Sequence, residues 1–372
     1  MSTKINVRSP YYVKVANASL SYVTLRLYVW TGTTASPNTL RYTLSKTEVG
    51  TNNYVVFELS ELIKDFLVTE YGTYSTDVVW VKYDYQIYNS SGSTVGSLVT
   101  SSNMLGVDGY GYFEDGVQPE LSKQLLQSNT ILYYNEGQDI VFPIWAEDLS
   151  TISLTSDSGA DVNWEAVEDF WNLYDVSWGY ALTPIVITDN GNTNQKIQYI
   201  RITSSAELQD GDTITITSGV GGGTTVITLE EICEPKYSPL NIIFYNKFGA
   251  LQNIWFFKKS MTTLNVRNET YKRSIMDFSS TPTYSEQIHQ VRTFNANGKE
   301  VLQANTGFID EQYNEVIRQL LLSEQVWVDN GTDVLPIRPI TNSLQFKTSV
   351  NDKLINYTLD FEYAFDKINN IR

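Results

Sequence analysis

Five carboxylates and two tryptophans fall within one short stretch of the chain and are its strongest candidates for chemistry. The carboxylates are Asp157, Asp161, Glu165, Glu168 and Asp169, and the tryptophans are Trp164 and Trp171. Two carboxylic acids at a defined separation can hydrolyse a glycosidic bond, and several carboxylate oxygens can bind Ca²⁺. Neither spacing is diagnostic, because the stretch lacks the EF-hand pattern and its closing glutamate. Runs of charge are usually solvated, so we expect an exposed acidic loop without catalytic, cofactor-binding or metal-ligating residues.

The chain has one histidine, His289, and one cysteine, Cys233. A histidine-based dyad or triad would have to use His289, which lies in a polar stretch without a partner motif. Cys233 has no second cysteine with which to form an intrachain disulfide. Its neighbours Ile232 and Glu234 carry no positive charge that would activate the thiol. We therefore expect a chain that is not an enzyme and that is assembled in a reducing compartment.

The glycine-rich run from Gly219 to Thr225 invites comparison with a phosphate-binding loop. Such a loop needs a lysine followed by serine or threonine to reach the phosphates and Mg²⁺, and this run has none. It lies between two expected strands, so we interpret it as a flexible hairpin loop.

Tyr110, Tyr112 and Phe113 form a short aromatic cluster in the sequence. Such a cluster can stack on a sugar ring, or it can fill the space between two domains. Aromatic side chains most often serve burial, and the cluster lies at an expected domain boundary. We therefore favour packing between domains.

Composition excludes several classes of protein. The chain has 372 residues, a net charge of −16, a charged content of only 18% and 25 tyrosines. No stretch approaches the roughly 20 apolar residues of a membrane span, so we expect neither a membrane span nor a hydrophobic leader. An acidic chain without a basic, aromatic-interleaved stripe is not expected to bind nucleic acid sequence-specifically. Tyrosine-rich, charge-poor surfaces are typical of β-rich proteins that contact protein or sugar.

The acidic charge is concentrated in the middle of the chain, which divides the sequence into three units. Residues 1–117 hold 8 Lys/Arg and 10 Asp/Glu, a net charge of −2. Residues 118–236 hold 4 and 18, a net charge of −14, and residues 237–372 hold 14 of each, a net charge of 0. We expect three domains with these boundaries.

The first unit has the pattern of an immunoglobulin- or fibronectin-like β-sandwich. Apolar and polar residues alternate over 23–29 and over 79–87, which predicts two half-buried strands. Ser60 is expected to cap one short helix, and turns are expected at 31–34 and 89–92.

The second unit is expected to be an acidic β domain. It opens with a short helix at 120–127 and carries an irregular excursion at 151–178, which holds the carboxylates and tryptophans described above. The expected strands are 139–146, 184–188, 196–203, 213–217 and 224–229.

The third unit is expected to contain a hairpin at 246–250, a polar loop or arm at 271–294 and one helix at 310–323. Asp310 is the expected helix N-cap, and Tyr313, Val316, Ile317, Leu320 and Leu321 form one apolar stripe. Alternation over 355–363 predicts a final half-buried strand. We expect the assembly core to use Leu320, Leu321, Tyr357, Leu359 and Phe361.

A strand pair around one amphipathic helix, followed by a long antiparallel finish, resembles the core of tail-tube and distal-tail (baseplate hub) proteins of tailed phages. Two short motifs also resemble the sequences of tail-associated virion proteins of phages infecting Bacteroidota. They are Asn351-Asp352-Lys353-Leu354-Ile355-Asn356-Tyr357 and, after it, Phe361-Glu362-Tyr363-Ala364. The resemblance covers about the last third of the chain and implies tandem sandwiches followed by a tail-tube-like β domain. It also implies a non-enzymatic virion structural protein of the tail, neck or baseplate.

Such a protein would be assembled in the host cytoplasm, with no cofactor. Its partners would be other tail or neck proteins and copies of itself in a cyclic oligomer, with a hexamer favoured by analogy with tail rings. Two other classes remain open. A carbohydrate-binding adhesin or receptor-binding protein would expose a glycan surface of Trp and Tyr, and a glycoside hydrolase would depend on the carboxylates between Asp157 and Asp169.

Overall fold

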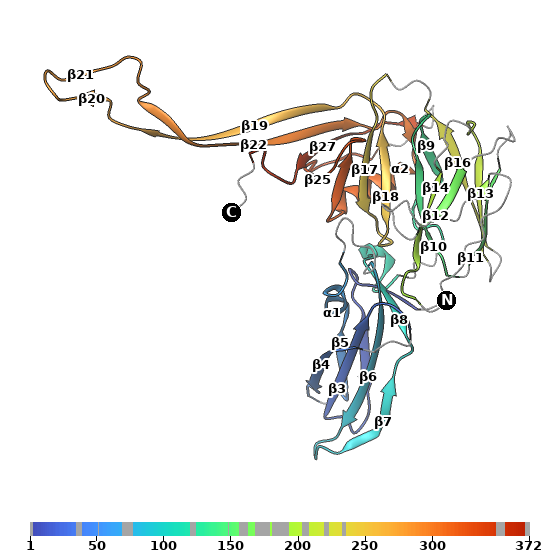
Figure 1. Ribbon diagram of the computed structural model, residues 1–372. Helices are drawn as coiled ribbons and strands as arrows, with labels where there is room; N and C mark the ends of the chain where they lie inside the picture. The colour runs from blue at the N-terminus through green and yellow to red at the C-terminus, as the bar shows by residue number, and fades with distance from the viewer. Residues whose placement is uncertain are drawn as a thin grey trace. The chain divides into compact units, whose positions relative to one another are not determined.

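The protein is mainly β, with 52% of its residues in strands and 6% in helices. The computed structural model describes residues 3–34, 39–50, 52–68, 77–119, 124–147, 149–155, 163–167, 179–180, 193–202, 208–218, 223–232, 236–346 and 354–368. Its strands form several separate sheets (Figure 1). The expected fold class, mainly β with sandwich-type sheets, is confirmed.

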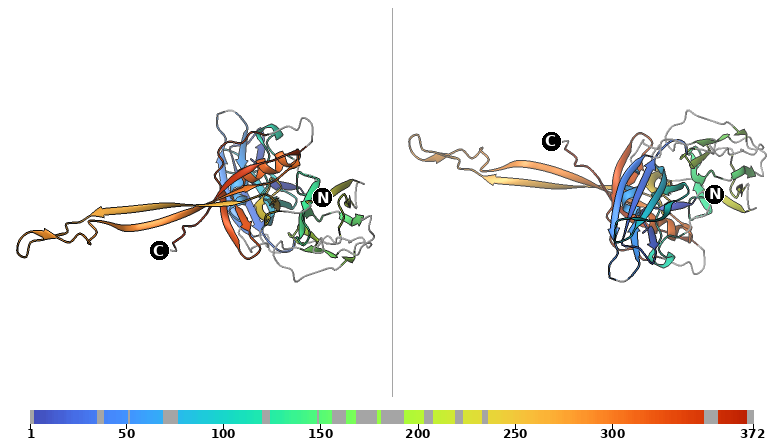
Figure 2. Two further views of the ribbon diagram at one scale, coloured as in Figure 1. Left: turned by 90° about the horizontal axis from the view of Figure 1, so that it is seen from above. Right: turned by 90° about the horizontal axis from the view of Figure 1, so that it is seen from below.

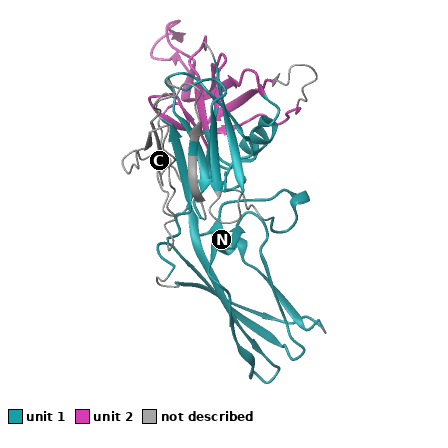
Figure 3. Cartoon of the chain, turned by 90° about the vertical axis from the view of Figure 1, so that its right-hand side faces the viewer, with its two compact units in different colours: residues 1–234, 243–254, 310–324 teal, residues 235–242, 255–309, 325–372 magenta. Residues whose placement is uncertain are grey.

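The chain folds into two compact units (Figure 3). Unit 1 comprises Met1–Glu234, Ile243–Ile254 and Asp310–Glu324, and unit 2 comprises Pro235–Ile242, Trp255–Ile309 and Gln325–Arg372. The chain crosses between the units within strands β17 (Leu240–Tyr245) and β18 (Leu251–Phe256). Each sheet nevertheless draws its strands from within one of the three segments expected from the sequence. The boundaries near residues 117 and 236 stay a prediction.

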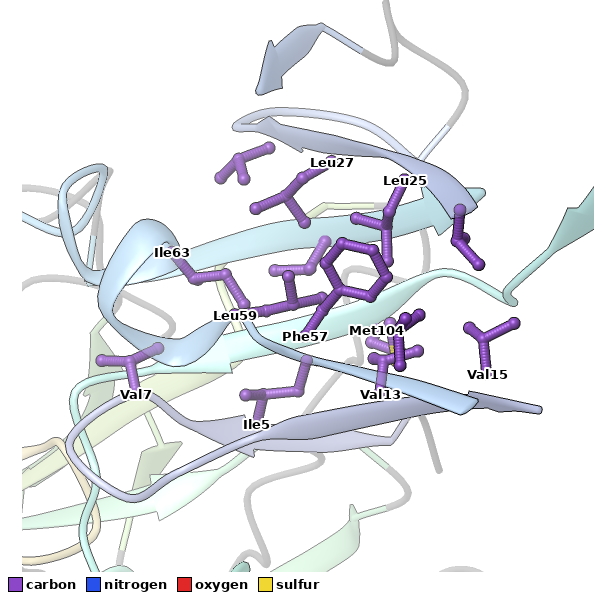
Figure 4. Close-up of a cluster of buried hydrophobic side chains, with 14 of the residues drawn as sticks. Ile5, Val7, Val13, Val15, Leu25, Leu27, Phe57, Leu59, Ile63 and Met104 are labelled. Carbon is purple, nitrogen blue, oxygen red and sulfur yellow. The ribbon is translucent and has the colours of Figure 1, made fainter. Parts of the chain in front are cut away.

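The first sandwich of unit 1 packs a sheet in the order β1-β8-β6-β3-β4, with β7 beside β6, against the pair β2-β5. Its strands are β1 (Lys4–Asn6), β2 (Tyr12–Ala16), β3 (Tyr22–Trp30), β4 (Leu40–Thr47), β5 (Tyr54–Glu58), β6 (Val78–Tyr88), β7 (Thr94–Thr100) and β8 (Met104–Val107). Helix α1 (Ser60–Lys64) follows β5. Alternate residues of β3 are buried, as its period-two pattern predicts. They meet Val13, Phe57 and Ile63 in one apolar core (Figure 4).

The second sandwich of unit 1 packs two four-stranded sheets around isoleucine-rich faces. One sheet has the order β10-β14-β12-β13 and the other β11-β15-β16-β9. Their strands are β9 (Ile131–Tyr134), β10 (Ile140–Trp145), β11 (Leu149–Thr155), β12 (Asn163–Val167), β13 (Gly179–Tyr180), β14 (Ile197–Ile202), β15 (Thr213–Ser218) and β16 (Thr224–Glu231). Phe142, Ile200, Ile214 and Ile227, all without exposed surface, lie in its core.

A helix expected at 120–127 is absent from the described part of that segment, residues 124–127. Leu125 instead forms an isolated antiparallel bridge with Ile144. Leu126 N–H donates to Pro143 O, and Trp145 N–H donates to Gln124 O. Extended pairing with β10 satisfies these backbone groups where helical bonds were expected.

The tight turn between β17 and β18 belongs to unit 1 and bonds to parts of that unit that are far away in the sequence. Asn246, fully buried, accepts from Phe248 N–H through Oδ1 at 3.0 Å and donates through Nδ2 to Leu126 O at 2.6 Å. Tyr110 N–H donates to Lys247 O at 2.9 Å. The turn therefore couples the end of the first sandwich to the start of the second.

Helix α2 (Tyr313–Leu322) also contacts this region between the first and second sandwiches, which we term the junction. Glu315 accepts from the Tyr112 hydroxyl at 2.7 Å, and Gln319 donates to Glu315 and to Ser128 at 2.9 and 2.7 Å. Val316, Ile317 and Leu320, from the predicted apolar stripe, are fully buried. A partly buried network whose members are hydrogen-bonded favours one arrangement of the parts it joins.

Asp108 is a buried carboxyl at this junction. It is 6% exposed, and its Oδ1 has no hydrogen-bond partner among the described residues. Burial, with Glu324, raises the pKa of Asp108 to about 6, although Arg8 and Lys64 favour its charged form.

The raised pKa predicts how stability depends on pH. Because the folded-state value exceeds the ordinary value of 3.8, the stability associated with the neutral acid is full below pH 3.8 and is lost as pH rises through 6. Asp108→Asn is expected to stabilise the protein above pH 6 by up to about 3 kcal/mol, and to change little below pH 4. Chemical unfolding of both proteins between pH 4 and 8 measures the difference, and a gap that does not depend on pH would contradict it.

Unit 2 is built on the antiparallel strands β24-β25-β27-β22-β19. Their bounds are β24 (Val326–Asp329), β25 (Val334–Pro339), β27 (Thr358–Tyr363), β22 (Val291–Asn305) and β19 (Met261–Lys272). Two short pairs add β20 (Met276–Asp277) with β21 (Thr283–Tyr284), and β23 (Ile309–Asp310) with β26 (Leu354–Ile355).

Two details of the expected C-terminal elements are wrong. The helix begins after Gln312 and not at Asp310, whose carboxylate accepts from Gln312 N–H at 2.9 Å in a local turn. The final strand is interrupted between β26 and β27. There Tyr357 N–H donates to the Thr306 hydroxyl, and Thr306 N–H donates to Tyr357 O, which replaces regular ladder pairing.

Candidate assembly surface

The most exposed regular element of the described chain is the two-stranded arm formed by β19 and β22. The two strands pair antiparallel from Met261 with Gln303 to Lys272 with Val291. Beyond the ends of β25 and β27 they continue together as a narrow ribbon that closes at the β20–β21 pair (Figures 1 and 2). The polar stretch 271–294, expected to be a loop or an arm, forms the outer part of this arm.

The root of the arm belongs to the core of unit 2. β22 pairs with β27 from Val301 with Glu362 to Asn305 with Thr358. Leu302 and Ala304 are buried there, as is Phe361, whose ring lies edge-on to Phe256 at 5.9 Å. Glu362 joins three strands, because its carboxylate accepts from Arg338 on β25 and from Lys299 on β22. These hydrogen bonds lower the pKa of Glu362. The arm is thus a continuation of a packed sheet.

Apolar side chains on the arm are exposed to an unusual degree. Of the 25 large apolar residues exposed among the described residues, ten lie between positions 261 and 294. They are Met261, Leu264, Val266, Tyr271, Met276, Phe278, Tyr284, Ile288, Val291 and Phe294. Phe278 and Phe294 are 71% and 67% exposed. Such a concentration on one element is typical of surfaces that bind another molecule.

The backbone of the arm leads to the same conclusion. An isolated two-stranded hairpin is at best marginally stable in water, and this one has almost no buried residue along β19. β19 is also the last strand of its sheet, so one of its edges carries unpaired N–H and C=O groups. A long, unprotected edge strand is usually covered in the functional assembly.

A β-bulge at the outer end of the ladder changes the direction of the side chains. The register shifts between Glu269 and Thr270, which leaves Phe294 unpaired. The Phe294 and Tyr271 rings meet edge-on at 6.5 Å. Next to them lie three cations, Lys272, Arg273 and Arg292, which we term the collar.

Four of the five residues expected to form the assembly core are buried: Leu320, Tyr357, Leu359 and Phe361. Leu321 is only half-buried, because it lies at the margin of the apolar face of α2. The helix belongs to unit 1 and the three strand residues belong to unit 2. The expected packing of the helix against that strand, and the role of these residues in assembly, stay predictions.

Most of the chemical candidates fall outside the described residues. Asp157, Asp161, Glu168, Asp169, Trp171 and Cys233 lie there, as do residues 184–188, 219–222 and 351–353. Trp164 and Glu165 lie on β12, and their side chains are not described. The strands on either side of the glycine-rich run pair antiparallel from Thr213 with Thr228 to Thr217 with Thr224, as a hairpin loop requires.

The remaining candidates, Tyr110, Phe113 and His289, differ in their burial and contacts. Tyr110 is 8% exposed, lies edge-on to Tyr112 at 5.9 Å and packs under the Arg8 guanidinium, which agrees with the packing interpretation. Phe113 is fully exposed and does not share that role. His289 is exposed near the end of the arm, where its backbone oxygen accepts from Arg273 Nε.

The described residues also limit what other sites can be assigned. Within them, no group of three or more His, Cys, Asp or Glu side chains is placed to hold a metal ion. No helix in the described ranges is long and apolar enough to cross a membrane.

Only part of the arm could be recognised from the sequence. Leu264 and Val266 alternate with Asn265 and Arg267, which is a strand pattern, yet such a pattern normally implies one buried face. Exposure of the apolar face depends on what lies opposite it, and a local pattern does not contain that information.

Comparisons with known proteins do not place the chain in a family. No protein-family model matches it, and no curated protein matches it. Among solved structures it is similar to the native conformation of E. coli alpha-2-macroglobulin, with 9% sequence identity and a TM-score of 0.20. That similarity covers 82% of this chain and 21% of the other, and at this TM-score it carries no argument about fold or function.

Proposed function

We propose that this chain is a non-enzymatic structural protein of a tailed-phage virion, acting in the tail, neck or baseplate by assembling into a homo-oligomeric ring. The arm of unit 2 is the observation that supports it most. The arm is continuous with a packed sheet and exposes apolar side chains that nothing in unit 2 covers among the described residues. Assembly with further copies would bury these side chains and remove their apolar surface from water.

The order of the ring rests on analogy. A cyclic homo-oligomer, with a hexamer favoured, follows from the resemblance of the last third of the chain to tail-tube and distal-tail proteins. Other tail or neck proteins are the proposed further partners, and the virion is the proposed location. The sandwiches of unit 1 would decorate the ring or contact its neighbours.

Shortening the arm is expected to abolish assembly without unfolding the protein. The variant lacks residues 270–294, with Asn-Gly joining Glu269 to Asn295, which face each other in the ladder. Seven of the ten exposed apolar residues are removed, while the pairing of β22 with β27 remains. Mass photometry at micromolar concentration is expected to show closed rings for the wild type and monomers for the variant.

His289→Ala is the matched control, because it changes the same end of the arm without removing apolar surface. Rings and infectivity in complementation of a virion lacking the protein should persist in this variant. A wild-type protein that stays monomeric, together with single copies in the imaged virion, would overturn the proposed function. Loss of infectivity in His289→Ala with normal particles would favour a catalytic or receptor-binding protein.

A further inference from the structure

The cations of the collar have no anionic partner among the described residues. Tyr271 pairs with Arg292 and Lys272 with Val291, and Arg273 N–H donates to Gln290 O, so the three cations occupy neighbouring positions on two strands. The nearest ion pair on the arm joins Arg267 to Glu269 and leaves the collar free. These exposed cations repel one another only weakly in water, and an anionic surface that faced them would gain favourable interactions with all three.

A complementary set of carboxylates lies at one end of the sheet β11-β15-β16-β9. Glu230 and Glu231 end β16, and Asp210 stands beside them because its carboxylate accepts from Glu231 N–H at 3.0 Å. The segment carrying Glu136 is held there as well, since Asn135 donates to Ile232 O at 3.1 Å. Within the described residues none of these four carboxylates forms an ion pair. We term them the acidic edge.

We propose that the collar of one copy docks on the acidic edge of a neighbouring copy, an inference that rests on the proposed ring. The arm over residues 261–300 carries 5 Lys/Arg and 4 Asp/Glu, whereas segment 118–236 has a net charge of −14 from 4 and 18. Cations that form no ion pair thus meet carboxylates that form none, among the described residues. Contact between two different surfaces of identical chains is heterologous, and it closes into a ring when the rotation between successive copies divides a full turn.

A lipid surface is the competing partner for an apolar tip with a basic collar. The backbone of the tip argues against it. Between Ser274 and Gln290 the ladder pairs are only Met276 with Tyr284 and Asp277 with Thr283, so most of its N–H and C=O groups need outside partners. Hydrocarbon cannot supply them, and each costs several kcal/mol when left unsatisfied there. A protein surface can supply them.

Exchanging the charges tests the docking. Lys272→Glu/Arg273→Glu and, separately, Glu136→Lys/Glu231→Lys are each expected to weaken self-association on the order of 100-fold, because like charges then face each other. Combining the four substitutions in one chain is expected to restore association to within roughly tenfold of the wild type. The matched control is Lys258→Glu/Lys259→Glu, which makes the same charge change at two exposed lysines outside the arm. Sedimentation velocity at two salt concentrations measures association, and unfolding midpoints establish that each variant is folded.

The outcomes separate this inference from the proposed function. Rings that survive both reversals, or a combined variant that stays dissociated, would overturn the docking while leaving ring assembly in place. A wild type that never associates would overturn both. Flotation with phosphatidylserine vesicles that is lost in Lys272→Glu/Arg273→Glu, without any effect of that variant on self-association, would assign the collar to lipid and overturn the proposal.

Discussion

Phe361→Asp is expected to unfold the sheet of unit 2 under conditions in which the wild type is native. Phe361 has no exposed surface, pairs with Leu302 of the neighbouring strand β22 and contacts the Phe256 ring. Loss of the buried ring costs about 3 to 5 kcal/mol, and the new carboxylate is buried without a partner at a further cost of several kcal/mol. The total is comparable to the whole stability of a typical domain, about 5 to 15 kcal/mol.

Thr358→Asp on the same strand is the matched control. Because Thr358 is exposed, the carboxylate of the substituted aspartate would stay hydrated. The free energy of unfolding should therefore change by no more than about 0.5 kcal/mol. Hydrogen-exchange mass spectrometry localises the effect: amides of β22, β25 and β27 should lose protection in Phe361→Asp alone. Native protection of these amides in Phe361→Asp would show that position 361 tolerates hydration and is not part of a cooperative core.

Elements with a clean apolar period could be predicted from the sequence. The alternation in β3 reports one face buried in the sandwich, and the stripe Val316, Ile317 and Leu320 reports the buried face of α2. In each element apolar residues recur with the period of the secondary structure, so local propensity and burial of one face favour the same conformation. Leu321 lies at the margin of the stripe and is only half-buried, because a position there belongs partly to the exposed face of the helix.

Elements held by distant partners could not be predicted in this way. Asp310 has the residue type of an N-cap, yet its carboxylate closes a turn that precedes the helix. The final strand breaks because Thr306, about fifty positions away, supplies a hydroxyl to Tyr357. The hydrogen bond between Tyr112 and Glu315 joins residues 203 positions apart, and no local pattern encodes it. The entropy cost of closing a loop rises only slowly with its length, so packing determines which distant segments meet.

The amino-acid composition predicts that the protein has a contact surface, but it does not predict where that surface lies. The surplus of tyrosine and the scarcity of charge indicate a protein that contacts other surfaces, but they do not say where. The arm becomes identifiable because the structure leaves Leu264, Val266 and Phe294 uncovered. A prediction of exposure needs the sheet order, in which β19 is an edge strand.

Gly249→Ala is expected to destabilise unit 1 more than a substitution of one methyl group ordinarily does. Gly249 has φ +77°, a conformation that costs an L-residue roughly 1 to 2 kcal/mol. An added Cβ would also lie 2.9 Å from the backbone N and C of Asp108 and 3.1 Å from Gly109 N, and backbone atoms cannot rotate away. Forced displacement in a packed region adds about 1 to 3 kcal/mol. We therefore expect a total loss of about 2 to 5 kcal/mol.

Gly92→Ala separates the two contributions of this prediction. Gly92 has the same φ of +77° in the turn after β6, but its added Cβ would have nothing within 4 Å. It should therefore lose only the conformational part, roughly 1 to 2 kcal/mol, and the difference between the variants measures the steric contact at the junction. Chemical unfolding of both variants gives that difference. Equal losses would mean that the turn between β17 and β18 does not press on the segment at Asp108, and that the junction is held by its hydrogen bonds and not by close packing at Gly249.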